Sequence, residues 1–170
     1  AANRILENAG TLTVSGGTVF FNLGNFGGGA VVNNLAGATF EVQGETDFSH
    51  NFATVSAFNN AGLFRKTGGG TTSFSSSLVA FNNTGTVEIV SGTLLLDGGG
   101  SLGGLIDVQS GGSLNLAGGT FTAPDGAAIT GPGTVLLTGG GASFNGELSV
   151  GTRLTISSGT WTFNANQSFT

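Results

Sequence analysis

The side chains that could act as acids, bases or metal ligands gather between residues 41 and 66. They are Glu41, Glu45, Asp47, His50, Arg65 and Lys66. Carboxylates near a histidine and cations are the groups that enzymes cleaving polysaccharides use for general acid/base catalysis. A single histidine among scattered carboxylates forms no recognisable acid/base pair, which favours a solvated bulge around residues 43–57 instead. We therefore expect no enzyme activity and no catalytic residues.

The pair Arg65-Lys66 stands where a neighbouring part of the chain has Glu88-Ile89, so it interrupts an apolar pattern. We expect this pair either to distort its strand or to be exposed to solvent.

Signals for metals and cofactors are weak. Asp97, followed by three glycines, and Asp107 resemble glycine–aspartate calcium turns, but the nonapeptide repeat of such turns never recurs. Calcium held by these carboxylates stays open as an alternative. The glycine runs 27–29 and 139–141 lack the Gly-Lys-Ser/Thr ending of a phosphate-binding loop. We therefore expect no metal and no cofactor.

The composition points to an ordered chain with an unusual architecture. The length of 170 residues suits one domain spanning residues 1–170. Charged residues make up 8% of the chain against a usual value of about a quarter, and there are 33 glycines. An apolar fraction of 38% and 14 phenylalanines argue against disorder. The glycines must therefore have an architectural role.

The charge pattern limits the partners. Arg4, Arg65, Lys66 and Arg153 are the only cations, too few for the basic surface that nucleic acids require. No apolar run reaches the roughly 18 residues of a membrane-spanning helix. The chain begins Ala1-Ala2-Asn3, which fits a mature product of signal cleavage and fits an excised fragment equally well.

Seven similar units follow one another along the chain. Each begins near a glycine that precedes a short alternating run: Gly10, Gly37, Gly62, Gly85, Gly112, Gly133 and Gly151. The steps between these turn glycines are 27, 25, 23, 27, 21 and 18 residues, within the range of repeat proteins with one coil per repeat. One unit cannot bury its own apolar face, so the units must stack.

The alternation after each turn predicts strands. Residues two apart are apolar, as in the pairs Leu12 and Val14, Phe40 and Val42, Val87 and Ile89, Leu114 and Leu116, Val135 and Leu137, and Leu154 and Ile156. We expect an all-β fold, a single-stranded parallel β-helix (β-solenoid) of about seven rungs with these side chains inside. The second run of each unit has no clear register: Phe48 and Phe74 suggest one phase, Trp161 and Phe163 the other.

Asparagines recur just before the turns at Asn8, Asn34, Asn60 and Asn83. Stacked asparagines can hydrogen-bond along the axis, so we expect a structural ladder. Regular Thr-x-Thr arrays on a flat face would suggest ice binding. Residues 11–13, 120–122 and 160–162 have this spacing, and we expect them on different strands or distant rungs.

The segments FNNAG at 58–62, FNNTGTVEIVSGTLLL at 81–96 and SGGSLNLAGGTFTA at 110–123 resemble the repeats of large bacterial extracellular β-solenoid proteins. This broad class includes autotransporter passengers and filamentous haemagglutinin-like adhesins. The resemblance implies a secreted, extracellular or cell-surface protein and leaves its activity open.

The two ends of such a stack present unpaired strands unless they are capped, and neither end of this sequence carries an evident cap. We therefore expect a structural subunit of an extracellular filament or matrix, whose partner is another copy stacked head-to-tail at about 33 Å per subunit. The candidate contact residues are Ile5, Leu12, Val14, Trp161, Phe163 and Phe169. The alternative is an adhesin segment that binds a glycan or a cell surface, for instance through loops 22–30 and 43–57.

Overall fold

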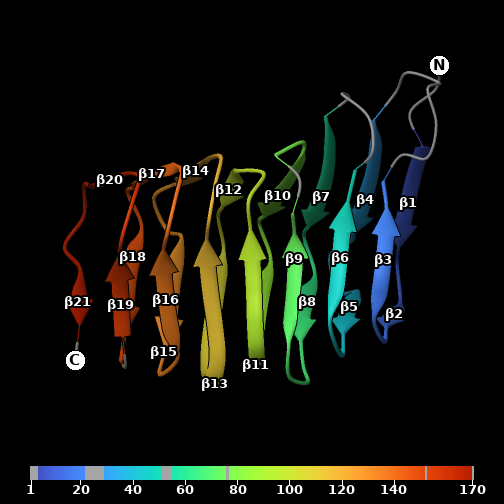
Figure 1. Cartoon of the computed structure of the whole chain (residues 1–170), viewed down its shortest axis with the longest axis horizontal. Helices are drawn as coiled ribbons and strands as arrows, with labels where there is room; N and C mark the ends of the chain where they lie inside the picture. Colours follow the sequence, from blue (N-terminus) through green and yellow to red (C-terminus); the bar gives the residue numbers. More distant parts are fainter. Residues whose placement is uncertain (1–3, 22–28, 51–54, 76, 152, 170) are drawn as a thin grey trace.

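The computed structural model describes residues 4–21, 29–50, 55–75, 77–151 and 153–169. Every regular element among them is a β-strand, and every strand pair is parallel. The chain winds into a β-solenoid of about seven turns, which confirms the expected fold class. Figure 1 shows the strands in sequence order from β1 at one end of the stack to β21 at the other.

Each turn contributes one strand segment to each of three faces. Face 1 consists of β1 (Arg4–Asn8), β4 (Ala30–Asn34), β7 (Ser56–Asn60), β10 (Val79–Asn83), β12 (Gly100–Leu102), β14 (Thr120–Ala123), β17 (Gly141–Phe144) and β20 (Thr160–Phe163). Face 2 consists of β2 (Thr11–Val14), β5 (Thr39–Val42), β8 (Leu63–Lys66), the first halves of β11 (Thr86–Leu96) and β13 (Leu105–Leu116), β15 (Ala128–Gly131), β18 (Glu147–Val150) and β21 (Ser168–Phe169). Face 3 consists of β3 (Gly17–Phe20), β6 (Thr46–Ser49), β9 (Thr71–Phe74), the second halves of β11 and β13, β16 (Thr134–Leu137) and β19 (Arg153–Ile156).

The strands follow the period-2 rule. In β10, Val79, Phe81 and Asn83 are buried inside the coil, whereas Ala80 and Asn82 are only half-buried on the outside. Because strands pair in register, equivalent residues form rows along the axis: Phe58 of β7 lies beside Phe81 of β10. Each fully buried large side chain in such a row stabilises the fold by about 1.5–3 kcal/mol, because its apolar area is removed from water. These rows can hold together a chain with few ion pairs.

The core changes composition along the axis. The third turn places one phenylalanine on each face, Phe58, Phe64 and Phe74, and all three are fully buried. Within a row the rings stack, with centroids 5.6 Å apart for Phe58 and Phe81, and between faces they meet edge to face. Beyond the fourth turn the inner rows are mainly aliphatic, with Phe121 and Phe144 as buried exceptions, so the aromatic section stabilises mainly the N-terminal half.

The structure corrects the expected phase of the later repeats. Gly10, Gly62 and Gly85 each directly precede a face 2 strand, and these strands are neighbours or near neighbours on that face. In contrast, Gly112 is paired with Gly92 at the corner between faces 2 and 3, and Gly133 stacks on it because Ser113 pairs with Thr134. The reason is that both corners are followed by the same Thr/Ser-apolar-x-apolar pattern. The two corners therefore look alike in sequence.

Two further glycines also leave the expected position. Gly37 lies one residue before the equivalent corner, which Ala38 occupies, and adopts φ +82 in a turn. The Gly151 amide donates to the Gly131 carbonyl oxygen at 3.0 Å, between β18 and β19. The units that start at residues 110, 131 and 149 are thus shifted by one face relative to the earlier ones.

The same shift explains the unclear register of the second runs. Phe48 and Phe74 point inward from face 3, on β6 and β9. Trp161 and Phe163 lie on β20 of face 1, beside Ala142 and Phe144. The two phases belong to two different faces.

Candidate functional site

The charged residues of the expected cluster are distributed over three environments. On the outside of face 2, Glu41, Arg65, Glu88 and Asp107 stand side by side on consecutive strands. Arg65 Nε lies 2.9 Å from Glu88 Oε2 in a partly exposed ion pair. Such exposed pairs contribute less than about 1 kcal/mol, so this row is a solvated charge pattern.

Asp47 belongs to face 3, where its Oδ1 accepts hydrogen bonds from the hydroxyls of Ser73 at 2.8 Å and Ser75 at 2.5 Å. His50 follows β6 on the same face. Among the described residues, Glu41 therefore lies on a different face of the coil from Asp47 and His50. Asp97 lies after β11, and Asp107 lies within β13. Among the described residues, no three or more His, Asp or Glu side chains lie close enough together to hold a metal ion.

Lys66 corrects the expectation of a distorted or exposed strand. β8 pairs with β5 and β11 without any shift in register, and the Lys66 side chain is fully buried inside the coil. Its Nζ donates to the carbonyl oxygens of Thr67 at 2.9 Å, Gly68 at 2.9 Å and Gly69 at 3.4 Å. Burial lowers the pKa of Lys66, and the nearby Glu45 carboxylate acts in the opposite direction. The lysine ties the 67–70 turn to the core.

The four asparagines of the expected ladder meet inside the corner between faces 1 and 2. The Nδ2 atom of Asn8 donates to Oδ1 of Asn34 at 2.8 Å, Asn34 to Asn60 at 2.7 Å, and Asn60 to Asn83 at 2.8 Å. Each Nδ2 also donates to a backbone carbonyl of the next turn, such as Thr86 O for Asn60 at 2.9 Å. The ladder ends where Leu102 follows Asn83 in the row.

A second ladder, not expected from the sequence, runs along the outside of the same strands. Asn59 Nδ2 donates to Asn33 Oδ1 at 2.9 Å, and Asn82 Nδ2 donates to Asn59 Oδ1 at 2.9 Å. The Ser101 amide completes it by donating to Asn82 Oδ1 at 3.2 Å. The signal was the doubled asparagine at 33–34, 59–60 and 82–83. Because neighbouring residues of a strand point to opposite sides, one asparagine of each pair joins each ladder.

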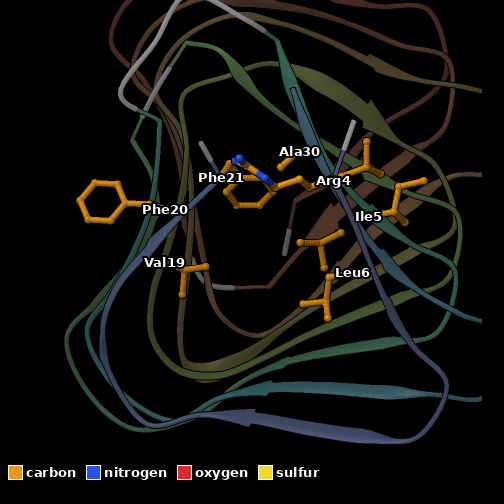
Figure 2. A pocket seen from close by; sticks show the side chains of 9 residues that line it. Arg4, Ile5, Leu6, Val19, Phe20, Phe21 and Ala30 are labelled. Atoms are coloured by element: carbon orange, nitrogen blue, oxygen red, sulfur yellow. The ribbon is translucent and has the colours of Figure 1, made fainter. Parts of the chain in front are cut away.

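The N-terminal end of the solenoid is open to a hollow. A cavity of about 270 Å³ lies in the mouth of the first turn, lined among others by Arg4, Leu6, Val19 and Phe21. Figure 2 shows Leu6 and Val19 pointing into the coil and Arg4 extending across the opening toward Phe21. The described side chains here are mostly smaller than the phenylalanines of the third turn, so they leave part of the bore unfilled.

The expected contact residue Ile5 belongs to the lining of this cavity, but its side chain does not point into the coil. It lies beside Val31 on the outside of face 1, is 62% exposed and points away from the coil in Figure 2. Its neighbour Leu6 points inward instead, because Leu6 pairs in register with the inward-facing Val32 of β4. Leu12 and Val14 of β2 do point inward and pack partly against the core.

The C-terminal end presents apolar side chains as well. Trp161 and Phe163 of β20 are partly buried and stack on Phe144, with ring centroids 6.3 and 5.3 Å away. Ile156 at the end of β19 is 51% exposed. Phe169 lies in β21, but its side chain is outside the described part of the structure.

The Thr-x-Thr segments are closer than expected. Thr120 and Thr122 of β14 and Thr160 and Thr162 of β20 lie on face 1, separated only by β17. Because β17 presents Gly141 and Ser143 outward, a shallow trough forms between the two threonine pairs. The threonine array is interrupted at its centre, unlike a continuous ice-binding surface.

Most of loop 22–30 and part of loop 43–57 lie outside the described residues. Residues 27 and 28 of the first glycine run lie outside them as well. No helix in the described part of the chain has the length and apolar character needed to cross a membrane. Comparisons with protein-family models, with curated proteins and with solved structures find no match for this chain.

Proposed function

We propose that this chain is a structural subunit of an extracellular filament, in which copies stack end on end through the terminal turns of the solenoid. The observation that carries the proposal is the loss of burial along the inner rows at both ends. On face 1, exposure rises from 0% at Phe58 through 6% at Val32 to 48% at Leu6. On face 3, it rises from 0% at Leu137 to 51% at Ile156.

Backbone groups add to the same argument. Among the described residues, β1 pairs only with β4 and β20 only with β17, so no described strand covers the outer edge of either. Such edges favour pairing with another chain. Because the two ends are unlike surfaces, their contact is head-to-tail and produces an open fibre. The low charge of the chain, 8% of its residues, keeps repulsion between copies small.

Stacking in register sets the axial repeat. Face 1 contains eight strands, and adjacent strands lie about 4.8 Å apart, so equivalent residues of successive copies should be about 38 Å apart. This distance replaces the 33 Å expected from seven sequence units, because the eighth strand, β20, adds one spacing on this face.

The bacterial origin and the cell-surface location are part of the proposal. Their support is the resemblance of segments 58–62, 81–96 and 110–123 to bacterial β-solenoid repeats, together with the observed solenoid. The test is to purify the chain and follow its assembly by sedimentation and negative-stain microscopy over increasing concentrations. We expect unbranched filaments that dissociate on dilution, and dispersed monomers at high concentration would contradict the proposal.

A second candidate function, glycan binding, is favoured by the trough on face 1. Thr120, Thr122, Thr160 and Thr162 line it with hydroxyl groups, and none of these residues carries a charge. Neutral sugars are recognised by such hydrogen-bonding groups. Calorimetric titration with neutral polysaccharides tests this function. Binding that is lost when Thr122 and Thr162 are replaced by valine would support it, and the absence of binding to all of them would reject it.

A further inference from the structure

We infer that end-on stacking inserts the indole of Trp161 from one copy into the hollow at the N-terminal mouth of the next, where it meets the guanidinium of Arg4. This inference rests on the proposed filament function and specifies its contact. It follows from three observations: the spacing of large side chains inside face 1, the orientation of the indole, and the size and charge of the hollow.

The central inner row of face 1 alternates large and small residues in the C-terminal half. Phe81 is followed by Gly100, Phe121 by Ala142, and then comes Trp161. A Cβ at Gly100 would lie only 2.0 Å from the Phe81 carbonyl oxygen, so this position admits no side chain. Alternation of this kind lets rings of successive layers interdigitate. The layer that follows Trp161 should therefore offer space rather than another ring.

The N-terminal mouth offers that space. In a continued face 1, the residue after Trp161 in this row is Leu6, because Leu6 pairs with Val32 and Val32 with Phe58 of the same row. Beside Leu6 lies the cavity of about 270 Å³. A large planar side chain entering from the neighbouring copy would fill a volume that the first turn leaves empty, and close packing stabilises such a contact.

The indole is held in a suitable position. Its Nε1–H donates to the Ser158 carbonyl oxygen at 2.7 Å, and one ring face stacks on Phe144 at an interplanar angle of 28°. Because Phe144 belongs to the preceding turn, the opposite ring face points out of the C-terminal end. Trp161 is only partly buried, in contrast to the fully buried Phe121 of the same row.

Charge complements shape at this contact. Arg4 occupies the row next to Leu6, and its side chain extends across the mouth (Figure 2). In the stacked arrangement this row continues from Gly159, so the guanidinium comes to lie diagonally over the indole. A cation over the face of a tryptophan within about 6 Å is attracted by the ring quadrupole. The C-terminal turn thus presents the preferred aromatic partner to the cation of the N-terminal turn.

Trp161 is the only tryptophan of the chain, so its fluorescence reports on this contact directly. We expect the emission to shift to shorter wavelength and iodide quenching to weaken as assembly, followed in parallel by sedimentation, proceeds. Filaments whose Trp161 stays accessible to iodide would overturn the inference and leave the filament function intact. Absence of assembly would overturn both. A shielded indole in dilute monomers would also contradict the inference.

Two variants test the pairing of Trp161 with Arg4. Arg4→Gln and Trp161→Leu should each weaken association by about 3- to 30-fold, and the double variant should be little worse than either. Arg4→Lys should restore part of the affinity, since it keeps the charge. Circular dichroism of each monomer controls for folding. Fully additive losses would show that the two side chains do not meet.

Discussion

The side chains of Asn60 and Asn83 are joined by a 2.8 Å hydrogen bond from Nδ2 to Oδ1, inside the coil and along its axis. One residue earlier, Asn82 Nδ2 donates to Asn59 Oδ1 at 2.9 Å in the opposite axial direction. The same two strands therefore carry two amide ladders, one in the core and one on the surface, with opposed dipoles. The inner ladder satisfies buried backbone carbonyls, whereas the outer ladder faces solvent, and this difference leads to the first prediction.

Replacement of Asn60 by alanine should lower the free energy of unfolding by about 2–4 kcal/mol, because it removes the side-chain donor to the Thr86 carbonyl and the two buried hydrogen bonds that Asn60 forms with Asn34 and Asn83. Asn59→Ala is the matched control and should cost less than about 1 kcal/mol, since water can replace its bonds. Urea denaturation of both variants measures the difference. Equal losses would show that the inner ladder has no special structural role.

Lys66→Met should destabilise the fold by about 1–3 kcal/mol, because the carbonyls of Thr67 and Gly68 lose the donor that ties their turn to the core. The control is Arg65→Ala, which removes only an exposed ion pair and should cost less than about 1 kcal/mol. If Lys66→Met is as stable as the native chain at neutral pH, the lysine does not anchor the turn.

The same pair of proteins has a defined pH dependence. Burial lowers the pKa of Lys66 in the folded state below its ordinary value of 10.5. At pH values between the folded-state pKa and 10.5, the unfolded state therefore binds more protons at this lysine than the folded state does. The free energy of unfolding contributed by this group therefore increases with pH in that window. The stability of the native chain relative to Lys66→Met should rise as pH approaches 10.5. A difference that stays constant or falls would be contrary to this assignment.

Two glycines at equivalent corners should respond differently to alanine. At Gly62 a Cβ would lie 2.4 Å from the carbonyl oxygens of both Leu35 and Ala38, whereas at Gly10 it would meet nothing within 4 Å. Gly62→Ala should therefore cost more than about 2 kcal/mol, and Gly10→Ala should stay within about 1 kcal/mol. Thermal unfolding of the two variants provides the measurement, and similar losses would refute the close-approach explanation.

The period-2 pattern was sufficient to predict the solenoid, and four recurring asparagines predicted their row. Sequence spacing did not distinguish the two corners, because glycine followed by Thr/Ser-apolar-x-apolar precedes face 2 at Gly85 and face 3 at Gly112. Only the strand pairing separates them. The sequence also led us to choose Ile5 rather than Leu6 as a contact residue, since both are apolar and only the pairing of β1 with β4 shows that Leu6 is the inward one.

The charged positions were less predictable still. Lys66 lies two residues after the buried Phe64, which is the spacing of an inward residue, but a lysine inside a core is rare without partners. Its partners are the backbone carbonyls of Thr67, Gly68 and Gly69, which directly follow it in the chain, and no side-chain pattern reveals them.

Charged substitutions at the two ends should prevent filament formation. Leu12→Asp and Phe163→Asp each place a carboxylate on an inward position of a terminal turn, where stacking would have to bury it at several kcal/mol. Thr11→Asp and Thr160→Asp, on the outside of β2 and β20, are the controls and should still assemble. Electron microscopy of folded variants, checked by circular dichroism, decides the matter; intact filaments with Leu12→Asp and Phe163→Asp would count against the end contact.

Engineered cysteines test the head-to-tail register most directly, because the chain has no cysteine of its own. Glu7 and Thr162 belong to the same outward row of face 1, on its first and last strands. In stacked copies they become neighbours at about 4.8 Å between Cα atoms, within disulfide reach, whereas in one copy they lie at opposite ends of the stack.

A chain carrying both Glu7→Cys and Thr162→Cys should form a ladder of disulfide-linked oligomers on mild oxidation, seen by non-reducing electrophoresis. The control with Thr155→Cys in place of Thr162→Cys puts the second thiol on face 3 and should remain monomeric. Efficient cross-linking of the first pair alone is the predicted result. Monomers from the first pair, or equal cross-linking of both pairs, would contradict head-to-tail stacking in register.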